Sequence, residues 1–241
     1  MTYAGSTLTA LTDLTVNAKT GAVTVPALAD AANITLSGTG TSSAVTLGTL
    51  GTTSNDHDLT LTATGLKAGL TVDTISYTAG NSFTAKLTGT TGSVNFADIG
   101  TSSAKLGNVT ITADGTKAVD TDAIYATGDV VINASNTTSA STIDGTVYGT
   151  NVTAKVDGSG IGSTIPTTVY ADTSVTLAAH ELAAATTYNI YGQGSSTKTA
   201  LTVNFTGGMN AETVNVYGST GQTAITLTGD LAGGSDVVLV D

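Results

Sequence analysis

Residues 58–65 read DLTLTATG, in which Leu59, Leu61 and Ala63 alternate with three threonines. A period of two places the aliphatic side chains on one face of an extended strand and the threonines on the other. β-Branched threonine favours extended backbone and tolerates water, so it suits the outer face. We interpret five further segments as strands of the same kind: 108–115 (NVTITADG), 200–207 (ALTVNFTG), 212–218 (ETVNVYG), 224–230 (AITLTGD) and 236–241 (DVVLVD).

The expected strand centres recur at short intervals. They are 11 to 14 residues apart in two series: Ile34, Val45, Leu59, Val72, Phe83 and Val94, then Ile190, Val203, Val216, Leu227 and Val238. Helical signals are confined to residues 25–33 and 180–186, which are long enough for only one or two turns. The chain therefore predicts about twenty short strands in a stacked arrangement, in which each unit buries its apolar face against its neighbours.

Two all-β architectures satisfy this pattern. One is a β-solenoid, with coils stacked at about 4.8 Å, small interior residues and glycine corners. The alternative is a pair of tandem β-sandwich domains, whose cores normally contain bulky aromatic anchors. The chain has 3 Phe, 8 Tyr and no Trp among 241 residues, which favours the solenoid. We expect a single elongated all-β repeat region over residues 1–241, and residues 157–166 (DGSGIGSTIP) are the best place for a break.

Composition excludes several classes of function. The net charge is −11 and all seven basic residues are lysine, whereas nucleic-acid binding requires a positive surface. Without cysteine the chain can form neither a thiolate metal site nor a disulfide. No apolar run approaches the length of a transmembrane helix, and the N-terminal residues lack the pattern of a cleavable signal peptide.

Aspartate is the one chemically distinctive residue type, with sixteen aspartates against two glutamates. Aspartate is a good turn residue, and groups of aspartates with turn carbonyls also bind calcium. Solvated turns therefore remain the alternative to a Ca²⁺ site. The candidate calcium ligands are Asp56 and Asp58, Asp120 and Asp122, and Asp230 with Asp236.

Other candidate sites have weaker support, and we do not expect an enzyme. His57 lies between two aspartates and His180 beside Glu181, but a single histidine in such a setting is usually a surface residue. No GxSxG-like context is present. A β-helical polysaccharide-active enzyme would use aspartate clusters, but its sugar site usually also contains Arg and Trp, which are absent.

Threonine triplets raise the hypothesis of ice binding. They occur at Thr60–Thr62–Thr64, Thr110–Thr112 and Thr226–Thr228. An ice-binding face needs such triplets at the same place in successive coils. The variable spacing along the sequence argues against that alignment, so we interpret these threonines as ordinary outer-face strand residues.

The last forty residues carry a family resemblance. FTGGMNAETVNVYGSTGQTAITLTGDLAGGSDVVLVD (205–241) resembles bacterial surface-layer (S-layer) proteins of the type I-secreted, RTX-related kind. Those proteins bind calcium through Gly-Gly-x-Gly-x-Asp turns, of which Gly233, Gly234 and Asp236 form a degenerate version. The resemblance implies an extracellular, self-assembling subunit of a bacterial surface layer or filament, with further copies and a cell-surface glycan as partners. A stalk segment of a secreted adhesin is the alternative.

Overall fold

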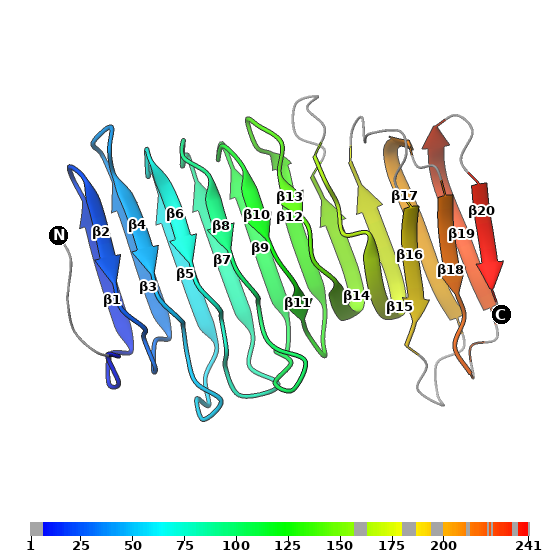
Figure 1. Ribbon diagram of the computed structural model, residues 1–241, viewed down its shortest axis with the longest axis horizontal. Helices are drawn as coiled ribbons and strands as arrows, with labels where there is room; N and C mark the ends of the chain where they lie inside the picture. The colour runs from blue at the N-terminus through cyan, green and yellow to red at the C-terminus, as the bar shows by residue number, and fades with distance from the viewer. Residues whose placement is uncertain are drawn as a thin grey trace.

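The protein is an all-β solenoid of parallel strands, as a computed structural model shows. The structure describes residues 7–156, 163–179, 187–193, 200–210, 213–220, 222, 224–232 and 236–240. Successive coils stack along the long axis, with β1 (Asp13–Ala18) and β20 (Asp236–Val240) at opposite ends (Figure 1). This confirms the predicted solenoid. Every pair of described strands is parallel, whereas tandem sandwiches are built from antiparallel sheets, so that alternative is wrong.

One side of the solenoid, the long face, runs the full length of the molecule. Its first strands are β1, β3 (Asn33–Gly38), β5 (Leu59–Thr64), β7 (Phe83–Thr88), β9 (Val109–Asp114) and β12 (Val130–Asn136). It continues with the second halves of β14 (Val147–Lys155) and β15 (Thr168–Ala178), then β17 (Ala200–Asn210) and β19 (Ala224–Ala232).

A second side, the short face, is a separate sheet of six strands. It comprises β2 (Ala22–Val25), β4 (Ala44–Leu47), β6 (Gly69–Val72), β8 (Val94–Phe96), β10 (Val119–Thr121) and β13 (Thr142–Ile143). Its strands shorten from four residues to two along the molecule.

The third side, the tyrosine face, widens as the short face narrows. It begins as a row of single parallel bridges that joins Leu8, Leu28, Leu50, Ile75, Ile99 and Ile124. It then becomes full strands: β11 (Ile124–Tyr125), the first halves of β14 and β15, β16 (Thr187–Gly192), β18 (Thr213–Tyr217) and β20. The coil therefore changes from three sides to two, and β14 crosses between faces at a register shift after Gly149.

The core is a set of in-register columns of aliphatic residues. For example, the column that begins with the single bridges from Leu8 to Ile124 continues without interruption through Val147, Val169, Ile190 and Val216. The five side chains of this column from Ile124 to Val216 are all buried. Each contributes about 1.5–3 kcal/mol by leaving water, because it packs between its counterparts in the coils on either side.

The predicted strand spacing corresponds to half a coil. Paired residues in neighbouring coils lie 20 residues apart at Asp13↔Asn33 and 28 apart at Val175↔Val203. Residues 25–33 form the end of β2, a bridge at Leu28 and a turn, and residues 180–186 lie outside the described part. The proposed break at 157–166 falls partly outside it too, although the flanking strands β14 and β15 pair directly.

Candidate functional site

The terminal strand β20 is the candidate functional site, because the interior columns emerge there at the surface. Val214 and Val216 of β18 are completely buried. Their register partners in the next coil, Val237 and Leu239, are 41% and 56% exposed. The strand pairs with β18 on one side, and no described strand pairs with its other side. Its outer edge thus combines unpaired backbone groups with uncovered core residues.

The outward side chains of β20 are also apolar. In the preceding coils one outer column consists of Asn189 and Asn215, joined by a hydrogen bond of 3.0 Å between side chains. That column ends in Val238, which is exposed. Of the five exposed large hydrophobic residues in the described part of the chain, four are in β20. Scattered exposed hydrophobes are normal, but a contiguous row of four indicates an interaction surface.

The opposite end of the solenoid is better covered. In β1 the inward residue Val16 is 9% exposed, and in β2 the inward residue Val25 is buried as well. Leu14 is partly buried and packs against the core. Among the described residues, the two ends therefore differ in degree: inward side chains are buried or partly buried in the first coil and exposed in β20.

The strand itself was predicted from the sequence, but its exposure was not. We interpreted residues 236–241 as one more alternating strand, but DVVLV contains four consecutive apolar residues. That break in alternation was the available signal. A strand with one face in water needs polar residues at its outer positions. A continuous apolar run is typical of a strand that is covered on both faces.

The predicted calcium ligands lie in three different parts of the molecule. Asp56 and Asp58 are exposed, and Asp58 Oδ1 accepts a hydrogen bond of 2.7 Å from the Ser82 amide in the next coil. Asp236 is exposed on β20, and the side chain of Asp230 and the residues Gly233 and Gly234 lie outside the described part. Within that part, no three His, Asp or Glu side chains gather closely enough to hold a metal ion. Calcium binding stays a prediction.

Asp120 and Asp122 do lie together, in a shallow groove over the short face. Register brings Asp73 and Asp144, which we did not single out, to the same groove. Asp120 Oδ1 accepts a hydrogen bond of 3.1 Å from the Thr142 amide, and burial raises the pKa of its carboxyl group against the effect of that bond. The groove has the carboxylates that a polysaccharide-active enzyme requires. Its lining contains no Lys, Arg, His, Tyr or Trp, so it offers a sugar no cationic group, and the aromatic residue in the lining, Phe96, is buried.

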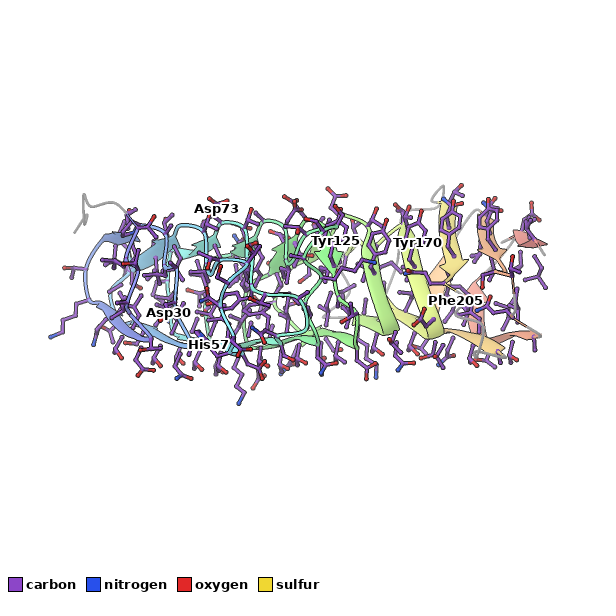
Figure 2. All side chains as sticks on the ribbon, turned by 90° about the horizontal axis from the view of Figure 1, so that it is seen from below. Asp30, His57, Asp73, Tyr125, Tyr170 and Phe205 are labelled. Carbon is purple, nitrogen blue, oxygen red and sulfur yellow. The ribbon has the colours of Figure 1, made fainter. Side chains whose placement is uncertain are left out.

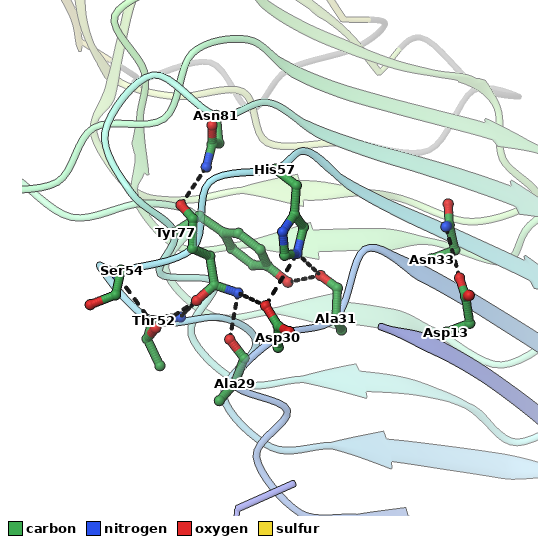
Figure 3. Close-up of polar contacts among 11 residues, drawn as sticks. Asp13, Ala29, Asp30, Ala31, Asn33, Thr52, Ser54, His57, Tyr77 and Asn81 are labelled. Carbon is green, nitrogen blue, oxygen red and sulfur yellow. Dashed lines mark hydrogen bonds and ion pairs between the residues drawn. The ribbon is translucent and has the colours of Figure 1, made fainter. Parts of the chain in front are cut away.

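His57 belongs to a polar network that joins three coils at their turns (Figure 3). Its Nε2 lies 3.3 Å from the Ala31 carbonyl oxygen and 3.9 Å from Asp30 Oδ1. The Tyr77 hydroxyl donates to the same Ala31 carbonyl, and burial raises the pKa of Tyr77. Asn55, which is buried, donates to the Ala29 carbonyl at 2.5 Å. These contacts supply hydrogen-bond partners to the carbonyl groups of the turns, so His57 has a structural role here. His180 lies outside the described part.

Two of the threonine triplets share outer columns, although they lie two coils apart. Thr60, Thr84 and Thr110 occupy one outer column of the long face in three successive coils. Thr62 and Thr112 share the next column, with Lys86 between them. These columns form despite the variable spacing because the coils differ in the length of their turns, while the strands stay in register; Lys86 interrupts the triplet in the coil between.

Comparisons with protein-family models, with curated proteins and with solved structures find no match for this chain. The described residues include no helix that is long and apolar enough to cross a bilayer. The resemblance of residues 205–241 to RTX-related S-layer proteins is accordingly a prediction that rests on those residues.

Proposed function

We propose that this chain is a structural, self-assembling protein of a bacterial surface layer or extracellular filament, and that β20 stacks on a second copy of the chain. The exposure of Val237 and Leu239 carries the proposal, because the same columns are buried in the two preceding coils. A second copy offers the matching chemistry: an apolar strand with an unpaired edge. Such pairing would satisfy the backbone groups of both strands and cover both apolar rows.

The negative charge of the chain opposes association of two copies. Each copy carries a net charge of −11, so two copies repel one another at low ionic strength. In β20 the one charged residue is Asp236, at the start of the strand, and the four residues that follow are neutral. Full burial of one such side chain is worth about 1.5–3 kcal/mol, and because Val237 and Leu239 are 41% and 56% exposed, covering both gains about that amount for the pair. That is enough to change a dissociation constant by about ten- to a hundredfold.

Particle size in solution tests this proposal. Because β20 meets β20, this contact closes at two copies, so we expect the purified chain to form at least dimers in sedimentation-velocity runs and elongated particles in electron micrographs. The double variant Val237→Lys/Leu239→Lys should sediment as a monomer, because two ammonium groups would be buried without partners. Val131→Lys is the matched control, since Val131 is 37% exposed but lies in the middle of the long face.

The outcomes separate the alternatives. Oligomers that survive the double variant would overturn assembly through β20, and so would a control variant that is monomeric. A wild-type chain that stays monomeric at all concentrations and salt conditions would favour the adhesin stalk.

Sedimentation with calcium and with a chelator tests the calcium hypothesis. If Ca²⁺ bridges acidic turns, the chelator will dissociate the oligomers. Oligomers that are unchanged by the chelator would remove calcium from the proposal.

The aligned threonine columns favour a second candidate function, adsorption to ice. Neighbouring strands place the hydroxyl groups of Thr60, Thr84 and Thr110 at a repeat of about 4.8 Å. We expect Thr84→Tyr to abolish any inhibition of ice recrystallisation, because the ring would project from the array. The control is Thr20→Tyr, at an exposed turn residue away from the long face. Equal loss in both variants, or no inhibition by the wild type, would exclude this function.

A further inference from the structure

Five tyrosines form a continuous stack on the tyrosine face. The centroids of neighbouring rings lie 5.1, 4.5, 4.7 and 4.6 Å apart, and neighbouring ring planes differ by 16° or less. The stack is produced by strand register, which pairs each tyrosine with the next one along the solenoid. We call it the tyrosine ladder; its members are Tyr125, Tyr148, Tyr170, Tyr191 and Tyr217.

The ladder is accessible from solvent along its whole length. Each ring is half-buried on an outward position of its strand, and Figure 2 shows Tyr125 and Tyr170 on the same side of the molecule. The other described tyrosines, Tyr77 and Tyr188, are buried. Tyr188 has Val214 as its register partner, so it has no tyrosine beside it in the next coil.

The ladder is a concentration of oxidisable groups in a chain that has no cysteine. Coils of this protein cannot be linked by disulfides, the usual covalent staple of extracellular proteins. Phenols offer another route, because two phenoxyl radicals on adjacent rings combine to a carbon–carbon bond. The stack holds such rings next to one another in advance, which removes the entropic cost of bringing them together.

We propose that the tyrosine ladder is a site of oxidative modification, at which a haem peroxidase and hydrogen peroxide join neighbouring coils through dityrosine. Two adjacent phenols each give one electron and one proton to the oxidised haem, and the peroxide is reduced to two molecules of water. The two radicals couple between the ring carbons ortho to the hydroxyl groups. The hydrogens on those carbons then move to the oxygens, so that two phenols are restored and the chain has lost two hydrogen atoms in all.

The structure also directs the cross-link to the interior of one chain. The register position that follows Tyr217 is occupied by Val240 of β20, so the ladder stops one coil before the exposed edge. A copy stacked on β20 would meet valine at this position. Cross-linking thus joins coils within one chain, and it is independent of whether the chain assembles.

Two double variants test the ladder, each of which removes two hydroxyl groups and keeps every ring. Tyr148→Phe/Tyr191→Phe leaves no two tyrosines adjacent, whereas Tyr125→Phe/Tyr217→Phe leaves three in a row. Dilute samples are treated with peroxide and a haem peroxidase, and dityrosine is measured by its fluorescence and located by mass spectrometry of peptides. We expect the first variant to fall to the level of a sample without peroxide, and the second to keep cross-links at Tyr148–Tyr170 or Tyr170–Tyr191.

Equal yields from the two variants would overturn the proposal, as would a wild-type chain without dityrosine or with links that involve tyrosines outside the ladder. Links found only between chains would overturn it as well. Circular dichroism first establishes that both variants are folded. If one is not, Tyr170→Phe serves instead: it leaves two separate pairs, and links should then map to Tyr125–Tyr148 and Tyr191–Tyr217 alone.

Discussion

Ile132→Ala will lower the free energy of unfolding by about 2–5 kcal/mol, the range for truncating a large buried aliphatic residue. Ile132 is completely buried in β12, between its register partners Ile111 and Ala154 in the adjacent coils. The hydrogen bonds between strands hold those coils about 4.8 Å apart, so the space left by the side chain cannot collapse. Denaturation by guanidinium chloride, followed by circular dichroism, measures the loss.

The neighbouring residue provides the control. Val131 is 37% exposed on the outer side of the same strand, and Val131→Ala should change the free energy of unfolding by no more than about 0.5 kcal/mol. Because each coil contacts only its neighbours, hydrogen exchange in Ile132→Ala should increase most in β9, β12 and β14. Similar losses for the two variants would mean that the inward and outward sides of β12 are assigned wrongly.

Gly92→Ala will destabilise the fold by about 1–3 kcal/mol, the cost of overpacking a dense site. A Cβ atom at Gly92 would lie 2.2 Å from the Ala68 carbonyl carbon and 2.2 Å from the Gly69 nitrogen. Both are backbone atoms of the preceding coil, so relief requires β6 and β8 to separate at the start of the short face. Thermal unfolding of the variant measures this cost.

Gly89→Asn is the matched substitution at the same turn. Gly89 has a φ of +58°, and no atom lies within 4 Å of a Cβ built there. Asparagine adopts this left-handed conformation more easily than other residues do, so the change should cost less than about 1 kcal/mol. A greater loss for Gly89→Asn than for Gly92→Ala would show that backbone conformation, and not the approach of two coils, determines glycine use at this corner.

Much of the fold could be predicted from the sequence. Alternation in residues 58–65 and 108–115 identified β5 and β9 and the inward direction of their aliphatic side chains. The shortage of large aromatic residues favoured a narrow coil over tandem sandwiches. Coil length was missed, because both faces of a coil have the same alternation and the strand spacing therefore reports half a turn.

Less of the candidate site could be predicted. The six aspartates singled out were chosen as pairs close in sequence, whereas the groove on the short face gathers Asp73, Asp122 and Asp144 from different coils. The tyrosine ladder was missed for the same reason. Its members Tyr148 and Tyr170 are 22 residues apart, while Tyr191 and Tyr217 are 26 apart, so no fixed period indicates a stack.

The sequence by itself determined which residues are extended and which side chains face inward, because those properties follow from local period and residue type. Only the tertiary structure decided which residues share a column. Hydrogen bonds between coils align strands with strands, and turns of different length absorb the extra residues without disturbing that alignment. Stacked tyrosines, threonine columns and the exposure of Val237 and Leu239 all depend on this register, and on which coil has a neighbour to cover it.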